Sequence, residues 1–249
     1  MIELVHLSKK FGDLLAVDDV NLTLAKGEFF AMLGPNAAGK TTTIKMLAGL
    51  IKPTTGHARI AGFDVQQQPL EARRRLAYVP DFPFLYDKLT GWEFLRFTGQ
   101  LFHLPDDRIE ANARELIARF HLLDHVNRPI ESLSHGTRQR VAIASALLHD
   151  PEVFIVDEPM VGLDPQHARI IKDVLKERSR AGVTVLVSTH QLSIAEEMAD
   201  RIGIIHGGKL IAVGTREELR RQSGSTGQLE EVFLSLTAGD NPNPDQPPA

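Results

Sequence analysis

The 249-residue chain carries 28 lysines and arginines against 32 aspartates and glutamates, which gives a formal net charge of −4 at pH 7. This acidity argues against nonspecific nucleic-acid binding, which needs a basic face to neutralise phosphates. The lack of cysteine excludes disulfides, thiolate nucleophiles and zinc–thiolate sites, and favours a reducing cytosol. The N-terminal segment has no signal-peptide pattern, and no apolar run approaches the roughly 18 residues of a spanning helix. A role at a membrane would therefore need a separate partner.

Short β-prone segments dominate the first sixty residues. We expect strands at three places in this part of the chain: Ile2–Ser8, Asp18–Leu24 and His57–Ala61. Glu28–Leu33 is apolar enough for a further, buried strand. The helix predicted to follow it spans Lys40–Leu50. Its apolar residues share one face at helical spacing: Ile44, Leu47 and Ala48.

The middle of the chain, from about residue 89 to residue 149, has no convincing strand pattern. Five apolar residues recur there at helical spacing: Ile109, Ala113, Leu116, Ile117 and Phe120. We therefore expect a helical insertion of about 60 residues within an α/β frame. Four aromatic residues are assigned either to its core or to a partner-facing surface: Trp92, Phe94, Phe97 and Phe102.

Apolar runs return after this insertion. Val153–Val156 and Val183–Val187 are continuous enough for strands buried on both faces, as in a parallel sheet. Pro165 suits the first position of a helix, which we expect to run to about Arg180. Two strands within Arg201–Val213 are predicted to meet at its pair of adjacent glycines. This alternation of strands and helices is typical of an α/β protein.

Three further features carry a weaker signal. Residues 238–249 are rich in proline, asparagine and aspartate, and we expect this tail to be disordered. His121 and His125 have the spacing of a metal site on a helix, but no further ligand completes the set. Arg73–Arg75 fall on a predicted helix with Glu71, which favours a solvated face.

A phosphate-binding motif lies between the predicted strand and helix near residue 40. Residues 34–41 match G-x-x-x-x-G-K-[ST] in full, in the strand–loop–helix context that the motif requires. The loop amides and the start of the helix would bind a phosphate chain. Lys40 would neutralise the β- and γ-phosphates, and the Thr41 hydroxyl would ligate Mg²⁺. We expect the loop to form with Ala37 at a negative φ.

Two adjacent carboxylates supply the second half of a nucleotide site. The predicted strand Val153–Val156 leads directly into Asp157 and Glu158. These residues would lie at the carboxyl edge of the sheet, where nucleotides bind in open α/β sheets. Asp157 can join the Mg²⁺ shell, and Glu158 can polarise an attacking water as a general base. The two motifs together predict a nucleoside-triphosphate site.

The segment Leu133–Arg140 indicates which class of nucleoside-triphosphate-binding protein this chain belongs to. Its sequence makes Ser134 a good cap for the helix that follows. The segment also resembles the signature loop, Leu-Ser-Gly-Gly-Gln, of ATP-binding cassette (ABC) ATPases. It departs from that loop at His135 and Thr137.

Four further residues resemble elements of this family, in the family's order along the chain. Phe11 stands where an aromatic residue stacks on adenine, and Asp81 stands where the Q-loop usually has glutamine. Asp164 lies in a segment similar to the D-loop, and His190 is similar to the switch histidine. The similarity continues to Leu236 and excludes only the tail.

This resemblance implies a P-loop NTPase (RecA-like) α/β core with an N-terminal antiparallel β subdomain and an inserted α-helical subdomain. Residues 1–237 would form a single ABC ATPase domain, with the helical part at about 89–149. In this family two cassettes pack head to tail around two ATP molecules. Each phosphate loop faces the signature loop of the partner, and hydrolysis loosens the dimer.

The resemblance also implies roles for individual residues. Glu158 and His190 would be catalytic, and Asp164 would lie at the subunit boundary. The ATP-binding residues would be Phe11, Val17, Gly34, Pro35, Asn36, Ala37, Ala38, Gly39, Lys40, Thr41, Thr42 and Asp81. The signature residues that contact the ATP of the partner would be Leu133, Ser134, His135, Gly136 and Thr137. The Mg²⁺ ligands would be Thr41, Asp81 and Asp157.

These features, with the ending Leu229–Thr237, are most similar to the bacterial exporter branch of the family. The resemblance implies an ATPase subunit that powers export through a separate integral-membrane permease, one helix of which would dock at the helical insertion and the Asp81 loop. We expect a second ABC subunit that pairs with this one when ATP binds, either another copy of the chain, which is favoured, or a close relative. We expect no nucleic-acid partner. The protein would act at the cytoplasmic face of the cell membrane and be soluble when isolated.

Two other classes remain as alternatives. A non-transport cassette protein would act on ribosomes or DNA, but such members usually carry two cassettes or long coiled-coil arms. A P-loop phosphotransferase would leave the Ser134 loop and His190 unexplained. Co-purification with an integral-membrane protein would support the transporter, and ribosome or DNA association would support the first alternative. A phosphorylated small-molecule product would support the second.

Overall fold

Apolar segments of the chain form the centre of a six-stranded sheet with the order β10-β9-β3-β8-β7-β6. The computed structural model describes residues 1–223 and 229–237. Every residue is buried in three strands: β3 Phe29–Leu33, β7 Val153–Asp157 and β8 Thr184–Thr189. The other strands are β6 Leu76–Val79, β9 Arg201–His206 and β10 Lys209–Gly214. All pairs are parallel except β9–β10, so β3, β7 and β8 end at one edge of the sheet.

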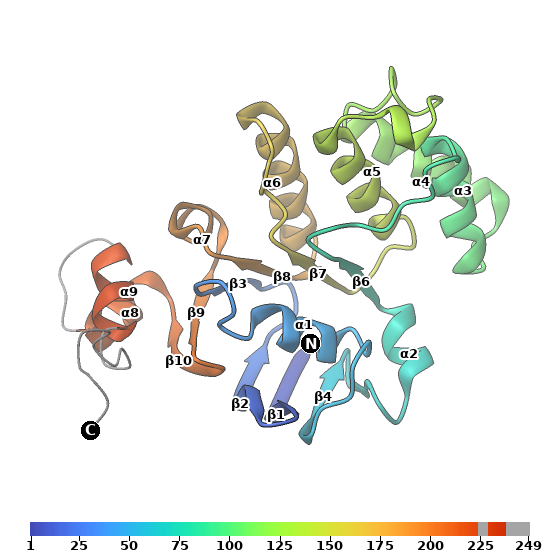
Figure 1. Ribbon diagram of the computed structural model, residues 1–249. Coiled ribbons are helices and arrows are strands. Elements are labelled where there is room, and N and C mark those ends of the chain that lie inside the picture. The colour runs from blue at the N-terminus through green and yellow to red at the C-terminus, as the bar shows by residue number, and fades with distance from the viewer. Residues whose placement is uncertain (224–228, 238–249) are drawn as a thin grey trace.

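A second sheet is antiparallel and has the order β2-β1-β4-β5. Its strands are β1 Ile2–Phe11, β2 Leu14–Leu24, β4 Thr55–Ile60 and β5 Phe63–Asp64. Helix α1, Lys40–Leu47, lies between the two sheets (Figure 1). One core cluster joins side chains from both sheets and the helix, including Leu4, Ile44 and Ile155. The α/β core and the N-terminal antiparallel sheet that the sequence predicts are therefore both confirmed.

Helices occupy the middle of the chain: α3 Gly91–Leu101, α4 Asp106–Arg119, the 3₁₀ turn η1 Ile130–Ser132 and α5 His135–Leu147. A capping box begins α3, because Thr90 Oγ1 accepts from the Glu93 N–H at 3.2 Å and the Glu93 carboxylate accepts from the Thr90 N–H at 2.8 Å. The five apolar residues predicted to share a face are all buried. No strand lies within 89–149, which is described throughout, so the helical insertion is confirmed.

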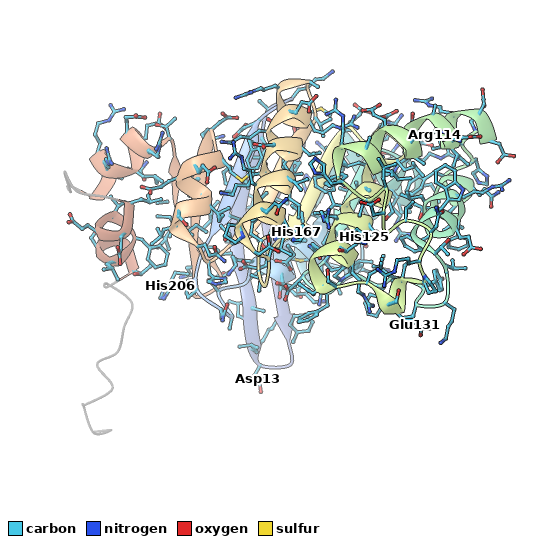
Figure 2. The ribbon with its side chains drawn as sticks, turned by 90° about the horizontal axis from the view of Figure 1, so that it is seen from above. Asp13, Arg114, His125, Glu131, His167 and His206 are labelled. Carbon is cyan, nitrogen blue, oxygen red and sulfur yellow. The ribbon has the colours of Figure 1, made fainter. Side chains whose placement is uncertain are left out.

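The aromatic residues of this helical region divide between core and surface. Phe94 is buried, whereas Trp92 is half-buried and carries the Arg114 guanidinium 5.7 Å from its ring centre. Viewed from above, Arg114 and Glu131 lie on the helical region, and Asp13 lies at the tip of the β1–β2 hairpin (Figure 2). The region thus presents aromatic side chains both inward and outward.

The remaining helices are α2 Pro69–Arg74, α6 Pro165–Arg180, α7 Leu192–Met198, α8 Arg216–Ser223 and α9 Leu229–Thr237. Helix α6 has the predicted bounds, and β9 and β10 meet at the predicted glycine pair. The helix predicted to reach Leu50 ends at Leu47, and Gly49 then takes a φ of 66°. Strands β5 and β6 and helices α7, α8 and α9 were not predicted, because short segments give little periodic signal.

The proline-rich segment 238–249, for which disorder was predicted, lies outside the described residues. Within 1–223 and 229–237, none of the helices combines the length and the apolar character that crossing a bilayer requires.

Candidate active site

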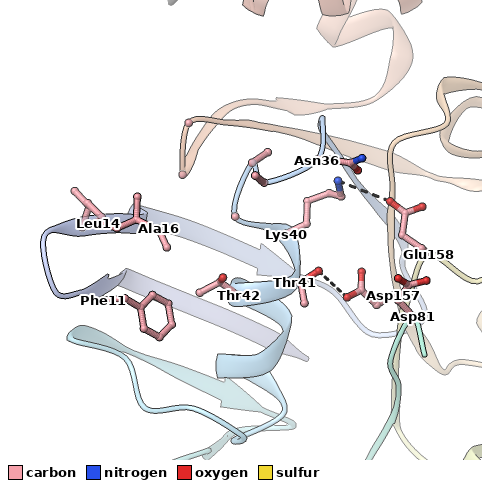
Figure 3. Close-up of a pocket in the computed structure, with 16 residues that line it drawn as sticks. Phe11, Leu14, Ala16, Asn36, Lys40, Thr41, Thr42, Asp81, Asp157 and Glu158 are labelled. Atoms are coloured by element: carbon pink, nitrogen blue, oxygen red, sulfur yellow. Dashed lines mark hydrogen bonds and ion pairs between the residues drawn. The ribbon is translucent and has the colours of Figure 1, made fainter. Parts of the chain in front are cut away.

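The loop between β3 and α1 requires glycine at both ends. A Cβ atom on Gly34 would lie 2.3 Å from the carbonyl oxygen of Ile205, and one on Gly39 would lie 2.7 Å from that of Ala16. Gly39 also has a φ of 104°, which side chains disfavour. The chain can therefore turn sharply from the strand into the helix, whose first residues face the cavity drawn in Figure 3.

Ala37 adopts a left-handed backbone with a φ of 63°, so the predicted negative φ is wrong. The reason is the turn that begins at Pro35, in which the Ala38 N–H donates to the Pro35 carbonyl at 3.3 Å. Ala37 is the third residue of this turn, a position where a positive φ closes the hydrogen bond. Alanine there costs about 1 kcal/mol relative to glycine, and the loop still forms.

Lys40, the first residue of α1, extends its ammonium group back over the loop. Its Nζ donates to the carbonyls of Gly34 at 2.7 Å and Pro35 at 3.0 Å, and lies 3.7 Å from Glu158 Oε1 (Figure 3). Burial lowers the pKa of Lys40, while the carboxylates of Glu158 and Asp157 act in the opposite direction. The ammonium group is thus held where an anion on the loop would meet it.

Asp157 ends β7 with a carboxylate that is only 1% exposed. Thr41 Oγ1 donates to its Oδ2 at 2.8 Å, and Ser188 Oγ donates to its Oδ1. These two hydroxyls come from α1 and β8, so the carboxylate joins three elements of the core. Burial of a carboxylate is tolerated because both oxygens accept hydrogen bonds.

Asp81 lies beside this group, in the segment that follows β6 (Figure 3). Burial and then the charge of Asp157 raise the pKa of Asp81, while His135 and His190 oppose that shift. Burial, together with the charges of Asp157 and Asp81, raises the pKa of Tyr78 to about 12. This end of the cavity therefore concentrates negative charge and hard oxygen ligands, which suits a cation such as Mg²⁺.

Glu158 follows Asp157 and has the geometry expected of a base. Its Oε1 lies 2.9 Å from His190 Nδ1, and the glutamate side chain is 12% exposed. The backbone of Glu158 takes a φ of 47°, a strained conformation for a non-glycine residue. The strand end therefore turns abruptly, and the acid points toward Lys40.

A cavity of about 610 Å³ contains most of the residues predicted to bind ATP. Those that line it are Phe11, Asn36, Ala37, Ala38, Gly39, Lys40, Thr41, Thr42 and Asp81, together with Asp157 and Glu158. Gly34 and Pro35 contribute through the carbonyls that hold Lys40. His190 reaches the site through Glu158.

The structure corrects the expectation for Val17. Its side chain is fully buried in the core between the sheets, and it does not line the cavity. Five residues that were not predicted line the cavity: Leu14, Leu15, Ala16, Gly207 and Gly208. The exposed leucines at the start of β2 were one available signal, because an exposed apolar pair on a hairpin suggests a contact surface.

The segment 133–137 lies outside the cavity, at the start of α5. Ser134 caps α5 as predicted, because its Oγ accepts from the Thr137 N–H at 3.3 Å. Leu133 and Thr137 are buried, whereas Ser134 and His135 are exposed and Gly136 is half-buried. Of the described residues that line the cavity, none comes from this segment.

Asp164 lies in the loop after Glu158 and caps α6. Its carboxylate accepts from the N–H groups of Gln166 and His167, each at 3.0 Å. The side chain of Asp164 is 55% exposed, so it is available to a neighbouring chain.

Comparison with known proteins identifies this arrangement. The family model described as ABC transporter matches residues 17–161. The chain is 38% identical over 240 residues to the probable multidrug ABC transporter ATP-binding protein YbhF of Escherichia coli (strain K12), covering 95% of this chain and 41% of that protein. It is 37% identical to the ABC transporter ATP-binding protein NatA of Bacillus subtilis (strain 168), over 94% of this chain and 97% of NatA. It is 39% identical to the daunorubicin/doxorubicin resistance ATP-binding protein DrrA of Streptomyces peucetius, over 90% of this chain and 68% of DrrA. The chain thus spans less than half the length of YbhF.

Solved structures agree with these relatives. The structure of an ATP-binding subunit of an ABC transporter superposes with a TM-score of 0.89 at 34% identity, covering 95% of this chain and 99% of that one. A dimeric post-hydrolysis state of the ATP-binding cassette MJ0796, bound to ADP and Pi, superposes with a TM-score of 0.80 at 28% identity. The match covers 86% of this chain and 98% of that one. The fold and the site define a P-loop ATPase. The chain belongs to the ABC transporter family of ATP-binding proteins, whose members hydrolyse ATP.

The strain at Ala37 can be measured. Ala37→Gly should be more stable than Ala181→Gly by about 1 kcal/mol, because only Ala37 is forced into the left-handed region. Ala181 is a matched control, since it is also exposed but has a φ of −77°. Urea denaturation of both variants and the parent measures the difference, and equal losses of stability would contradict the strain.

The role of Lys40 can be tested within its own helix. Lys40→Ala should weaken ATP binding by at least about tenfold, because the phosphates lose a charged hydrogen-bond donor. Lys45→Ala, at an exposed position of α1, should bind as the parent does. Titration calorimetry measures both affinities, and an undiminished affinity for Lys40→Ala would contradict the assignment of the loop.

Proposed function

We propose that this chain is the ATP-hydrolysing subunit of an ABC exporter that works with a separate integral-membrane permease. The observation that carries the proposal is the Glu158–His190 pair beside Lys40, in a cavity that the segment 133–137 does not reach. One chain thus supplies a phosphate loop and a base, while its signature residues are left for another molecule.

ATP would lie with its base at the Phe11 end of the cavity and its phosphates on the loop. The Phe11 ring is 47% exposed, and with Leu14 it offers an apolar surface on which adenine can stack. The N-terminus of α1 would bind the phosphates through its free amides. Lys40 Nζ would exchange the carbonyls of the loop for phosphate oxygens, a stronger charged hydrogen bond.

Glu158 would act as the general base on the attacking water. Its carboxylate is mostly buried and is held by His190 Nδ1, so its orientation is set before the nucleotide binds. His190 is 44% exposed at the cavity edge, where it would contact the γ-phosphate and position the water. A base fixed in advance needs little reorganisation during the reaction.

Mg²⁺ would be held by Thr41, Asp157 and Asp81. The donor set fits, because hydroxyl and carboxylate oxygens are the ligands that this cation prefers. When bound, Mg²⁺ would neutralise charge on the phosphates. Asp81 is shorter than the glutamine common at this position and cannot donate a hydrogen bond, so it would act on the cation through water.

A second copy of the chain would complete each site. Ser134 and His135 are exposed and lie outside the cavity of their own chain. The dimer of the MJ0796 cassette, bound to ADP and Pi, supports a dimeric arrangement. We propose an ATP-dependent homodimer in which residues 133–137 of one chain meet the γ-phosphate on the other, with Asp164 at the boundary.

Export is supported by relatives and by one surface. YbhF and DrrA are named for multidrug transport and for daunorubicin/doxorubicin resistance. Three aromatic residues after Asp81 are strongly exposed: Phe82, Phe84 and Tyr86, at 76%, 95% and 58%. Such a cluster suits docking of a permease helix against the helical region. The chain would then work at the cytoplasmic face of the membrane.

The dimer model makes a direct prediction. Glu158→Gln should bind ATP but lose at least about 100-fold in turnover, because the amide cannot take the proton from water. It should also accumulate as a dimer in Mg-ATP, since the bridging γ-phosphate stays intact. Glu152→Gln, at the other end of β7, is the matched control. Phosphate release and gel filtration measure both effects, and a Glu158→Gln variant that stays monomeric at saturating Mg-ATP would refute the model.

The Asp81 assignment predicts a metal dependence. Asp81→Asn and Asp81→Gln should raise the half-saturating Mg²⁺ concentration for ATPase activity about tenfold, because each removes a carboxylate near the cation. Asp87→Asn changes a nearby carboxylate that pairs with Arg138, and should behave as the parent. A Mg²⁺ titration of the ATPase rate at a fixed ATP concentration measures the half-saturating Mg²⁺ concentration of each variant. Parental Mg²⁺ dependence and turnover in both Asp81 variants would show that this position does not tune the chemistry.

A further inference from the structure

The side chain of His135 connects the signature segment, residues 133–137, to the loop that follows Glu158. His135 Nε2 lies 3.3 Å from the carbonyl oxygen of Val161. A carbonyl can only accept, so the imidazole must be the donor and carry its proton on Nε2. The ring also packs on the next residue, since a Cβ atom on Gly162 would lie 3.4 Å from its Cδ2 and Nε2 atoms.

The same loop residue is bonded to Glu158. The Val161 N–H donates to the Glu158 carbonyl at 3.3 Å. Two successive hydrogen bonds therefore join His135 to the backbone of Glu158. One is accepted by the Val161 carbonyl, and the other is donated by the Val161 N–H. The base in turn contacts His190 at 2.9 Å and Lys40 at 3.7 Å. A continuous chain of contacts thus runs from the phosphate loop to the signature segment.

A second contact supports the same juxtaposition. Gly136 lies against the start of α6 and the loop before it, where an added Cβ atom would be 3.3 Å from His167 Nδ1 and from Leu163 Cδ2. His167 is itself held by the Asp164 carboxylate. The first residues of α5 and the loop 159–164 are therefore packed on each other. Among the residues that the structure describes, His135 alone adds a side-chain hydrogen bond between these two segments.

We propose that His135 is a positioning residue that transmits the occupancy of this chain's nucleotide pocket to its own signature segment. The proposal rests on the proposed function, in which residues 133–137 serve the nucleotide bound by the partner. A phosphate that draws Lys40 away from Glu158 Oε1 shifts the strained Glu158 backbone slightly, while the contact with His190 keeps the carboxylate oriented. The Val161 carbonyl and His135 then carry this shift to the start of α5. The two ATP sites of a dimer are coupled through each chain in this way.

The backbone around this link is suited to movement. Glu158 and Gly162 both have left-handed backbones, with φ values of 47° and 72°, and they flank residues 159–161. Val161 is 39% exposed, so little packing opposes a small displacement. A glycine at position 135, as in the signature loop that this segment resembles, would have no group to reach the Val161 carbonyl. The hydrogen-bonded connection is thus specific to a chain with a donor at this position.

The test uses the monomer, so that it does not depend on dimer formation. Amide hydrogen exchange of residues 134–138 is measured with and without Mg²⁺ and the non-hydrolysable β,γ-imido analogue of ATP, at a protein concentration where gel filtration shows a monomer. In the parent chain, the analogue should slow exchange of the Thr137 and Arg138 amides about threefold or more, because the start of α5 is held more firmly. His135→Ala should lose this response while binding the analogue. His135→Gln should restore it, because the amide can donate to the same carbonyl.

The outcomes separate the inference from the proposed function. An equal response in His135→Ala, or no response in the parent chain with the analogue bound, would overturn the link. Failure of His135→Gln to restore the response would also overturn it, because the contact would then be steric rather than a donated hydrogen bond. A parent chain that does not bind the analogue would instead contradict the assignment of the pocket. Because His135→Gln alters the same exposed side chain, a response restored in it shows that lost stability does not explain the effect of His135→Ala.

Discussion

The carboxylate of Asp157 is the interaction on which the rest of the site depends. It is almost completely buried at the end of β7, and it is held by hydroxyls from Thr41 and Ser188. Those two residues belong to α1 and β8, so one side chain sets the position of the phosphate loop relative to the sheet. An unpaired carboxylate at this depth would be strongly unfavourable, which keeps the three elements in register. The position of Glu158 follows from it, because that residue is next in the chain.

A second constraint is the separation between the cavity and the exposed start of α5. The cavity collects the charged groups that we propose bind and cleave a triphosphate, whereas Ser134 and His135 lie outside it. In the proposed dimer, each chain therefore contributes one half to each of two composite sites. The His135–Val161 contact joins the cavity loop to the start of α5 within one chain, which in the proposed dimer gives a physical route between the two nucleotide sites.

Motifs that are contiguous in the sequence were predicted well. Lys40, Thr41 and Asp157 were identified because their chemistry depends on spacing within a short segment, and the strand–loop–helix order places them. Residues brought in by the antiparallel sheet were not predicted well. Strand β1 shifts register against β2 between Leu7 and Lys9, and again at the next residue. A shift of one residue exchanges the faces of a strand, so sequence alternation could not show that Val17 points into the core.

The sequence by itself determined the class of fold, the helical insertion, the phosphate loop and the acidic strand end, because local periodicity and motif spacing encode them. Only the tertiary structure decided the backbone of Ala37, since its left-handed φ is imposed by closure of the turn at Pro35. It also decided that Leu14 and Gly208 line the cavity, and that His135 reaches Val161. These contacts join segments far apart in the chain, and the packing of whole elements sets their distances.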